Sequence, residues 1–293
     1  MIIGTHKQQV IHNIKTACEE GTYNRKVEVD DPVLPAKAQQ DLIRKYQKVR
    51  RFPLGYGLCN VIARSVVDQA SYAINRTTRY EGLEQIRKIK DGAILTSNHF
   101  NPLDNTAVRM AAKKVGKRRL YIVSQITNLA MCGWVGFLMR FIDCIPICAK
   151  NRTYMTGAFE QRLEQLLQKK QWILIYPEEE MWFNYKKPRP LKRGAYYYAA
   201  KYHVPVLSFF VEMKETNEKD SEEFYKTQYV VHVLSPIYPD ASLTRREDSK
   251  RMMKLDYEQK KACYERVYQK PLTYDFSYED IAGYCGDDKG KIT

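Results

Sequence analysis

From Thr77 onward the chain alternates short apolar runs with longer amphipathic stretches, and this alternation constrains its fold more than any other feature. Six apolar runs have the length and composition of buried strands: Ala93 to Ser97, Leu120 to Ser124, Cys144 to Cys148, Trp172 to Tyr176, Val204 to Val211 and Tyr229 to Leu234. Amphipathic stretches predict helices over Pro102 to Lys114, Thr153 to Lys170, Leu191 to His203 and Arg245 to Gln269. We therefore expect an α/β fold: a mixed, largely parallel sheet flanked by helices.

The residues before this region have a helical pattern instead. Ala36 to Arg51 carries apolar side chains at helical spacing with a basic opposite face, and Gly57 to Ile74 repeats the pattern. The sequence thus predicts an N-terminal helical segment over residues 1–75. An α/β domain follows over residues 76–272 and includes the last helix, and residues 273–293 form a tail that we expect to be frayed.

The uncharged run from Tyr121 to Met139 is about long enough to span a bilayer. Polar residues interrupt its first half, so a buried strand followed by a short apolar helix is the favoured interpretation and a spanning helix the alternative. The N-terminus has no apolar core of a signal peptide. Seven Cys without a CxxC pair indicate neither a disulfide framework nor a zinc ribbon, so we expect a reducing, cytoplasmic compartment.

The segment from Ser97 to Asp104 directly follows the first of these strands. Asn101 suits the N-cap of a helix and Pro102 its first position, so Asp104 falls in the first helical turn. His99 then lies on the turn before the helix, where Asp104 can hold one imidazole nitrogen while the other faces a cleft. A base oriented in this way activates a hydroxyl group. A capped helix preceded by an exposed histidine explains the bare spacing equally well.

In these residues the sequence resembles the phospholipid/glycerol acyltransferase family, the lysophosphatidate acyltransferase-like enzymes, whose first motif is Asn-His-x4-Asp. Further blocks of the family match in order between about Arg79 and Val211: Tyr80 to Glu84, Gly133 to Phe137, Ile145 to Ile147, Trp172 to Glu178 and Lys192 to Ala195. The resemblance implies an O-acyltransferase of phospholipid biosynthesis. Its donor would be acyl-CoA or acyl-carrier protein, and its acceptor a hydroxyl of a lysolipid or glycerolipid-like molecule. His99 would be the general base and Asp104 its orienting group, with no further cofactor.

Two departures from the family concern its acceptor site. The third motif is usually Pro-Glu-Gly-Thr-Arg, but only Pro177 and Glu178 carry over, and Ala149 stands where an Arg usually ends the second block. The family's two arginines are associated with the acceptor's phosphate, which Lys does not bind in the same bidentate way. We expect neighbouring residues to bind the acceptor or its phosphate: Asn98, Glu178, Lys150, Arg152, Lys186, Lys187, Arg189, Lys192 and Arg193. A solvated basic loop is the alternative for the last five.

The charge balance, 48 basic and 34 acidic residues or +14, favours polyanionic partners. An amphiphilic acceptor implies a protein peripheral to the anionic inner face of the membrane. Candidate contacts are the N-terminal helices, with Arg50, Arg51 and Arg64, and the apolar segment Trp134 to Met139. Packing within a soluble protein accounts for those helices equally well. No nucleic-acid reading module is visible, so we expect no specific nucleic acid.

Two other interpretations of the sequence remain open. An altered third motif also fits a catalytically silent protein that binds lipid or nucleic acid on the same scaffold, although the retained His-Asp pair favours an enzyme. Glu178, Glu179 and Glu180, together with His99 and Asp104, could be metal ligands, but three adjacent carboxylates at a strand end cannot all point inward because neighbouring side chains alternate between faces. We therefore expect no metal.

Overall fold

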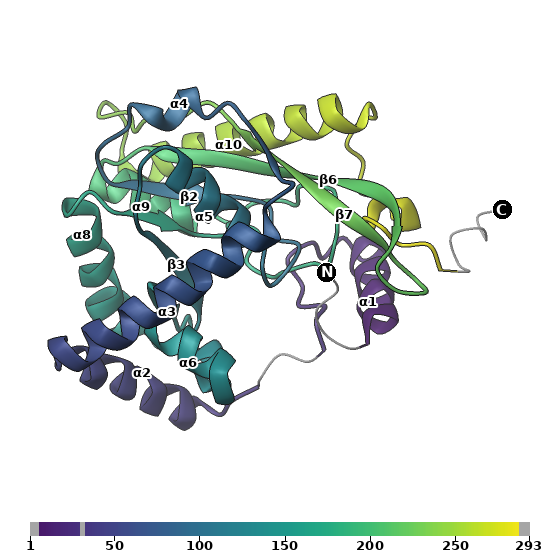
Figure 1. Cartoon of the computed structure of the whole chain (residues 1–293). Helices are drawn as coiled ribbons and strands as arrows, with labels where there is room; N and C mark the ends of the chain where they lie inside the picture. The colour runs from purple at the N-terminus through teal and green to yellow at the C-terminus, as the bar shows by residue number, and fades with distance from the viewer. Residues whose placement is uncertain (1–5, 30–32, 287–293) are drawn as a thin grey trace.

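The structure, a computed structural model, describes residues 6–29 and 33–286, which form a seven-stranded sheet between helices (Figure 1). The strand order is β1-β7-β6-β2-β5-β3-β4, and every neighbouring pair is parallel except β6 and β7. This confirms the expected mixed, largely parallel sheet. The strands are β1 Arg79–Glu81, β2 Ala93–Thr96, β3 Leu120–Gln125, β4 Cys144–Ile147, β5 Trp172–Leu174, β6 Val206–Lys219 and β7 Tyr225–Val233.

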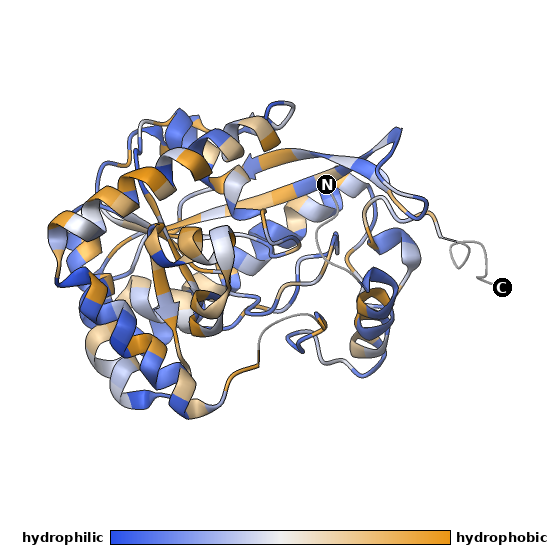
Figure 2. Cartoon of the chain, turned by 60° about the horizontal axis from the view of Figure 1, so that its bottom comes forward, coloured by the Kyte–Doolittle hydropathy of each residue, from blue (hydrophilic) through white to orange (hydrophobic). Residues whose placement is uncertain are grey.

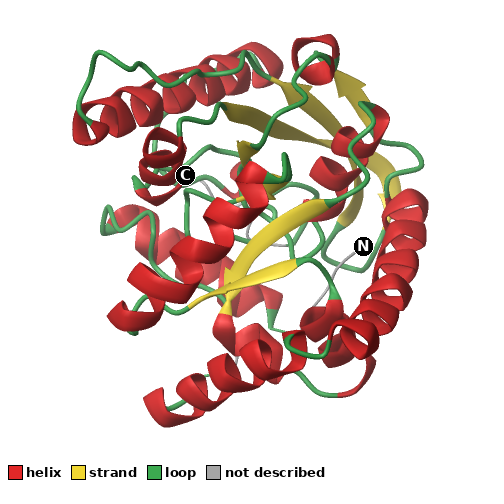
Figure 3. Ribbon diagram, turned by 90° about the vertical axis from the view of Figure 1, so that its left-hand side faces the viewer, coloured by secondary structure: helices red, strands yellow, loops and turns green. Residues whose placement is uncertain are grey.

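Helices cover both faces of the twisted sheet (Figure 3). Alternate residues of a strand point to opposite faces, so Ile94 joins one core cluster with α8, α9 and α10 while Leu95 joins another with α4 and α5. The helices are α1 Lys7–Glu19, α2 Ala36–Arg50, α3 Pro53–Ile74, α4 Glu84–Arg87, α5 Asn105–Lys114, α6 Gly133–Phe141, α7 Arg152–Tyr154, α8 Glu160–Gln168, α9 Gly194–Tyr202 and α10 Arg245–Tyr268. Short 3-10 or π turns are η1 Ile126–Ala130, η2 Met155–Phe159 and η3 Tyr278–Asp280.

The run from Tyr121 to Met139 forms β3, the 3-10 turn η1 and most of α6, which confirms the prediction of a strand followed by a short apolar helix. Within residues 6–29 and 33–286, none of the helices combines the length and the hydropathy that crossing a membrane requires.

The start of the helix after β2 differs from the prediction. Residues 101–104 form a turn, and α5 begins at Asn105 with Asp104 at its N-cap. The side chain of Asn101 accepts a hydrogen bond from the backbone N–H of Leu103 at 3.1 Å, which stabilises the turn locally and delays the helix.

The expectation of a frayed tail is wrong for residues 273–286. Ile281 and Tyr284 are buried with Val10 and Ile14 of α1 in a separate hydrophobic cluster. The segment is therefore held in place because its apolar side chains pack against the apolar face of α1. Asp280 is also buried and pairs with cations. Residues 287–293, the rest of the predicted tail, lie outside the described residues. The first helix therefore packs beside the C-terminal segment, while α2 contacts α3.

Candidate active site

The site lies at the edge of the sheet where the parallel strands end. β2 ends at Thr96 and leads into His99, and its neighbour β5 ends at Leu174 and leads into Glu178. In parallel sheets ligands bind outside these carboxyl ends. β4 ends at the same edge three strand positions from β2, which at the usual strand spacing is about 14 Å. The topology therefore brings the first and third motifs into contact and leaves the residues after β4 further along the edge.

The structure brings His99 and Asp104 together, as the sequence predicts. Nδ1 of His99 lies 2.7 Å from Oδ2 of Asp104. The same carboxylate oxygen accepts hydrogen bonds from the backbone N–H groups of Phe100 at 2.9 Å and Asn101 at 3.3 Å, so the turn itself holds the carboxylate. The Asp104 side chain is 2% exposed and the imidazole 20% exposed. The pair thus combines a buried carboxylate with a partly accessible ring, the arrangement of an oriented general base.

Tyr176 contacts both members of this pair, and the sequence analysis did not identify it. Its hydroxyl donates to Oδ1 of Asp104 at 2.5 Å, and its ring stacks on the imidazole of His99 with centroids 3.9 Å apart. The alternation of side chains along β5 could have indicated this contact. Tyr176 points to the same face of the sheet as Trp172 and Leu174, whose side chains pack in the cluster that contains α5. Asp104 is the N-cap of that helix.

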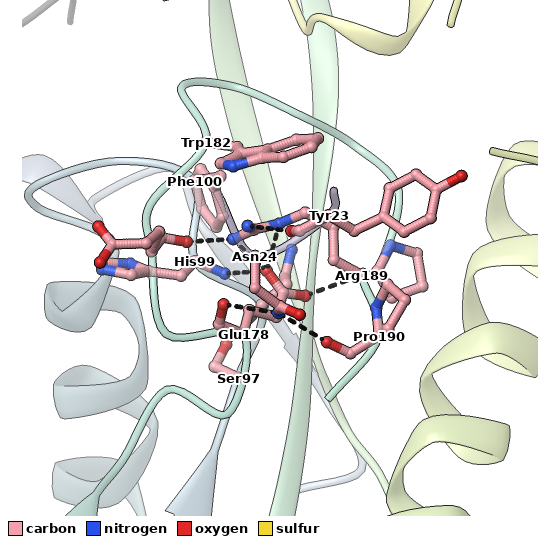
Figure 4. A network of polar contacts seen from close by, with 12 residues as sticks. Tyr23, Asn24, Ser97, His99, Phe100, Glu178, Trp182, Arg189 and Pro190 are labelled. Carbon is pink, nitrogen blue, oxygen red and sulfur yellow. Dashed lines mark hydrogen bonds and ion pairs between the residues drawn. The ribbon is translucent and has the colours of Figure 1, made fainter. Parts of the chain in front are cut away.

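Glu178 contacts the backbone of His99 rather than its ring (Figure 4). Its Oε2 accepts the backbone N–H of His99 at 3.2 Å and Nη2 of Arg189 at 2.9 Å. Its Oε1 accepts the backbone N–H of Arg189 at 3.1 Å. Burial lowers the pKa of the Arg189 guanidinium, although its attraction to Glu178 opposes that change. The guanidinium nevertheless keeps its charge because an arginine starts from such a high pKa, so the two residues form a buried, charged pair.

The segment after α1 braces this buried pair, a contribution that sequence reasoning also missed. Asn24 donates from its side chain to the backbone carbonyls of Glu178 at 3.1 Å and Pro190 at 3.0 Å. Nη1 of Arg189 donates to the carbonyl of Tyr23 at 2.9 Å (Figure 4). No sequence motif indicates these contacts, because each of them involves a backbone carbonyl. The residues that they join also lie more than 150 positions apart in sequence.

The expected acceptor contacts of Asn98, Glu178 and Arg189 need correction. The amide of Asn98 donates to the carbonyl of Val211 at 3.0 Å and accepts its N–H at 2.8 Å, which ties the turn to β6. Glu178 and Arg189 are each 1% exposed and bind one another. Because these polar groups already have partners inside the protein, they hold the site together rather than face an acceptor.

The loop carrying Lys186 and Lys187 is not the solvated basic loop of the alternative interpretation. Lys187 is 4% exposed and pairs with Asp280 at 2.7 Å. Lys186 pairs with Glu215 of β6 at 2.8 Å. The C-terminal segment and the β6–β7 arm thus supply carboxylates that neutralise these cations, and the expectation that they bind the acceptor is corrected accordingly.

Four expected acceptor residues do lie on the surface. Lys150 and Arg152 follow β4, and Lys192 and Arg193 precede α9. The backbone N–H of Lys192 donates to the carbonyl of Pro177 at 2.7 Å, which places it beside the third motif. Their role toward an acceptor stays a prediction.

The chain thus has a mixed α/β fold with a His-Asp pair at the edge where its parallel strands end. Residues 77–212, which include both motifs, match the family model described as Acyltransferase. Among solved structures, the chain is similar to the crystal structure of the 1-acyl-sn-glycerophosphate (LPA) acyltransferase PlsC from Thermotoga maritima. The identity is 13% and the TM-score 0.50, with 90% of this chain and 97% of the other covered, a likeness of fold. No curated protein matches the chain.

Proposed function

We propose that the protein is an O-acyltransferase that moves a fatty acyl group from a thioester donor to a hydroxyl of a glycerolipid-like acceptor. The donor is acyl-CoA or acyl-carrier protein. The observation that carries the proposal is the 2.7 Å contact between His99 and Asp104 at the strand edge, within the segment that matches the family. The fold neighbour acts on 1-acyl-sn-glycerophosphate, which supports a lysophospholipid as the first acceptor to test.

In the proposed reaction, Nε2 of His99 takes the proton of the acceptor hydroxyl while the oxygen attacks the thioester carbonyl. The tetrahedral intermediate collapses, the carbon–sulfur bond breaks, and the leaving thiolate takes up the proton from the imidazolium. Asp104 keeps the other proton of the ring on Nδ1 and stabilises the imidazolium. The products are an ester and a free thiol, and no acyl-enzyme intermediate is required.

The acceptor's phosphate, in this proposal, meets the surface cations Lys150, Arg152, Lys192 and Arg193. Glu178 and Arg189 belong to the support of His99 instead, because each neutralises the other. Several surface Lys and Arg side chains attract a phosphate with less directional control than one bidentate Arg, so the acceptor range is expected to be broad.

A membrane surface completes the proposal, since acceptor and product are amphiphiles. Leu54 and Leu58 of α3 are 90% and 66% exposed, and Trp134 and Val135 of the contacting helix α6 are 57% and 56% exposed. Figure 2 shows hydrophobic stretches on the outer helices. Large apolar side chains gathered on neighbouring surface helices are typical of an interfacial anchor. We propose that these helices hold the protein at the cytoplasmic face of an anionic membrane.

The replacement His99→Ala tests the proposed chemistry. We expect a loss of turnover of at least about a hundredfold, the scale of a general base, with native thermal stability. The assay follows thioester consumption with acyl-CoA or acyl-carrier protein and a panel of lysolipids, and mass spectrometry identifies the acylated product. Near-native transfer by the variant would reject the assignment. A native protein that binds lipid but consumes no thioester across the panel would instead support a silent binding protein.

A further inference from the structure

Each carboxylate oxygen of Asp104 has a side-chain partner of its own. Oδ2 binds the imidazole of His99 at 2.7 Å, and Oδ1 accepts the hydroxyl of Tyr176 at 2.5 Å. The phenol ring lies nearly parallel to the imidazole, with an interplanar angle of 14°. One tyrosine therefore restricts rotation of the carboxylate and covers a face of the imidazole at the same time.

We propose that Tyr176 is a positioning residue for the acyl transfer, acting through Asp104 on the His99 ring; this inference rests on the proposed function. A carboxylate held by one oxygen can rotate about its bond to Cβ, which changes the angle of its hydrogen bond to the imidazole. The hydrogen bond from Tyr176 to the other oxygen removes this freedom, and the stacked ring limits rotation of the imidazole. General-base catalysis requires such fixed geometry, because Nε2 must lie within hydrogen-bond reach of the acceptor's proton.

The hydroxyl of Tyr176 also acts on the charge of Asp104. By donating to Asp104 it withdraws negative charge from the carboxylate, so Asp104 stabilises an imidazolium less than it would without this hydrogen bond. Burial, with the negative charge of Asp104, raises the pKa of Tyr176 well above its usual value, so the phenol remains a donor over the working pH range. A variant without this hydroxyl leaves more negative charge on Asp104 beside the imidazole.

Other titratable groups also face this dyad. Glu178 binds the backbone N–H of His99 and is itself paired with Arg189. Tyr229 of β7 lies close enough to feel the charge of Asp104, and burial raises its pKa to about 12. Replacing Tyr176 leaves all three of these groups in place, so a difference between the variant and the native protein reports on the dyad.

The test compares the native protein with Tyr176→Phe, which keeps the ring and removes the hydroxyl. We expect kcat to fall at least about tenfold with KM changed by less than about twofold, because a hydrogen bond to a charged group acts here without touching the substrate. We also expect the acidic limb of the kcat/KM profile to move to higher pH by about one unit. Tyr176→Leu, which removes the stack as well, should lower kcat further.

Tyr268→Phe is the matched control. The Tyr268 hydroxyl, at the C-terminal end of α10, accepts the backbone N–H of Met213 at 2.9 Å, so its loss removes a tyrosine hydrogen bond that contacts neither His99 nor Asp104. This control should keep the native kcat and pH profile. The proposal is overturned if Tyr176→Phe retains both, or if its activity falls only in proportion to thermal stability with an unmoved acidic limb. Full turnover by His99→Ala in the same assay would overturn the proposed function itself, whatever Tyr176 does.

Discussion

The buried pair of Glu178 and Arg189 makes a quantitative prediction about stability. Replacing Arg189 with Met keeps much of the apolar volume but leaves the Glu178 carboxylate buried without its cation. The pair is 1% and 2% exposed at its side chains, so solvent hardly screens it. Arg189→Met also removes donors to the backbone carbonyls of Tyr23 and Glu180. The loss therefore reaches the N-terminal segment as well as the site.

The magnitude follows from the cost of leaving one buried charge unpaired, which is about 3–5 kcal/mol. For a chain of this size, a loss of that order lowers the melting temperature by roughly 10 °C. Removing the charge as well should recover part of the loss, because the double variant Glu178→Gln with Arg189→Met buries no ion. We therefore expect the double variant to be more stable than Arg189→Met alone.

Urea and thermal unfolding of the native protein, both single variants and the double variant measure this coupling. Lys226→Met is the matched control, since its ion pair with Glu218 at 2.9 Å is exposed and should contribute no measurable stability. The reasoning is refuted if Arg189→Met unfolds within about 1 kcal/mol of the native protein, or if the double variant is the least stable of the four.

Three further predictions concern the surface and the scaffold. Leu54→Glu, on the exposed face of α3, should weaken flotation with anionic liposomes at low salt and leave the melting temperature unchanged. Burial works to raise the pKa of Glu212, but the hydrogen bond from His232 prevails and lowers it, so this stabilisation exists above the ordinary carboxyl pKa and is lost as pH falls. Unfolding curves of Glu212→Gln should thus show a deficit at pH 7 that shrinks below about pH 4. Gly92→Ala should destabilise the protein by at least about 1 kcal/mol in urea unfolding, because its Cβ would meet the carbonyl of Leu167 at 2.4 Å.

The sequence predicted the His99–Asp104 contact because both residues belong to one turn, where local geometry decides the outcome. It also predicted the central strands, whose apolar runs are buried on both faces. It missed β1 and the outer part of β6. Glu212 and Lys214 alternate with the apolar residues Val211 and Met213, and the residues after Lys214 are polar. A stretch of this composition becomes a strand because β7 pairs with it.

The ion pairs of the basic loop show a different limit of sequence reasoning. Lys187 and Arg189 look like surface cations in a chain of net charge +14, since composition records charge but not partners. Lys187 finds its carboxylate at Asp280, 93 positions later, and Arg189 finds Glu178 only because the loop folds back. Partnerships of this kind depend on tertiary structure, and no spacing rule reveals them.

In the proposed function, the position of Arg189 accounts for an altered third motif beside a retained His-Asp pair. Arg189 restores a guanidinium beside Glu178, but from a position eleven residues later and directed at the carboxylate that holds the backbone of His99. A guanidinium committed in this way has no bidentate edge left for a phosphate. We propose that the chain separates two tasks: buried groups fix the base, and acceptor recognition passes to surface cations such as Lys192, where a change of residue can alter the acceptor without disturbing His99.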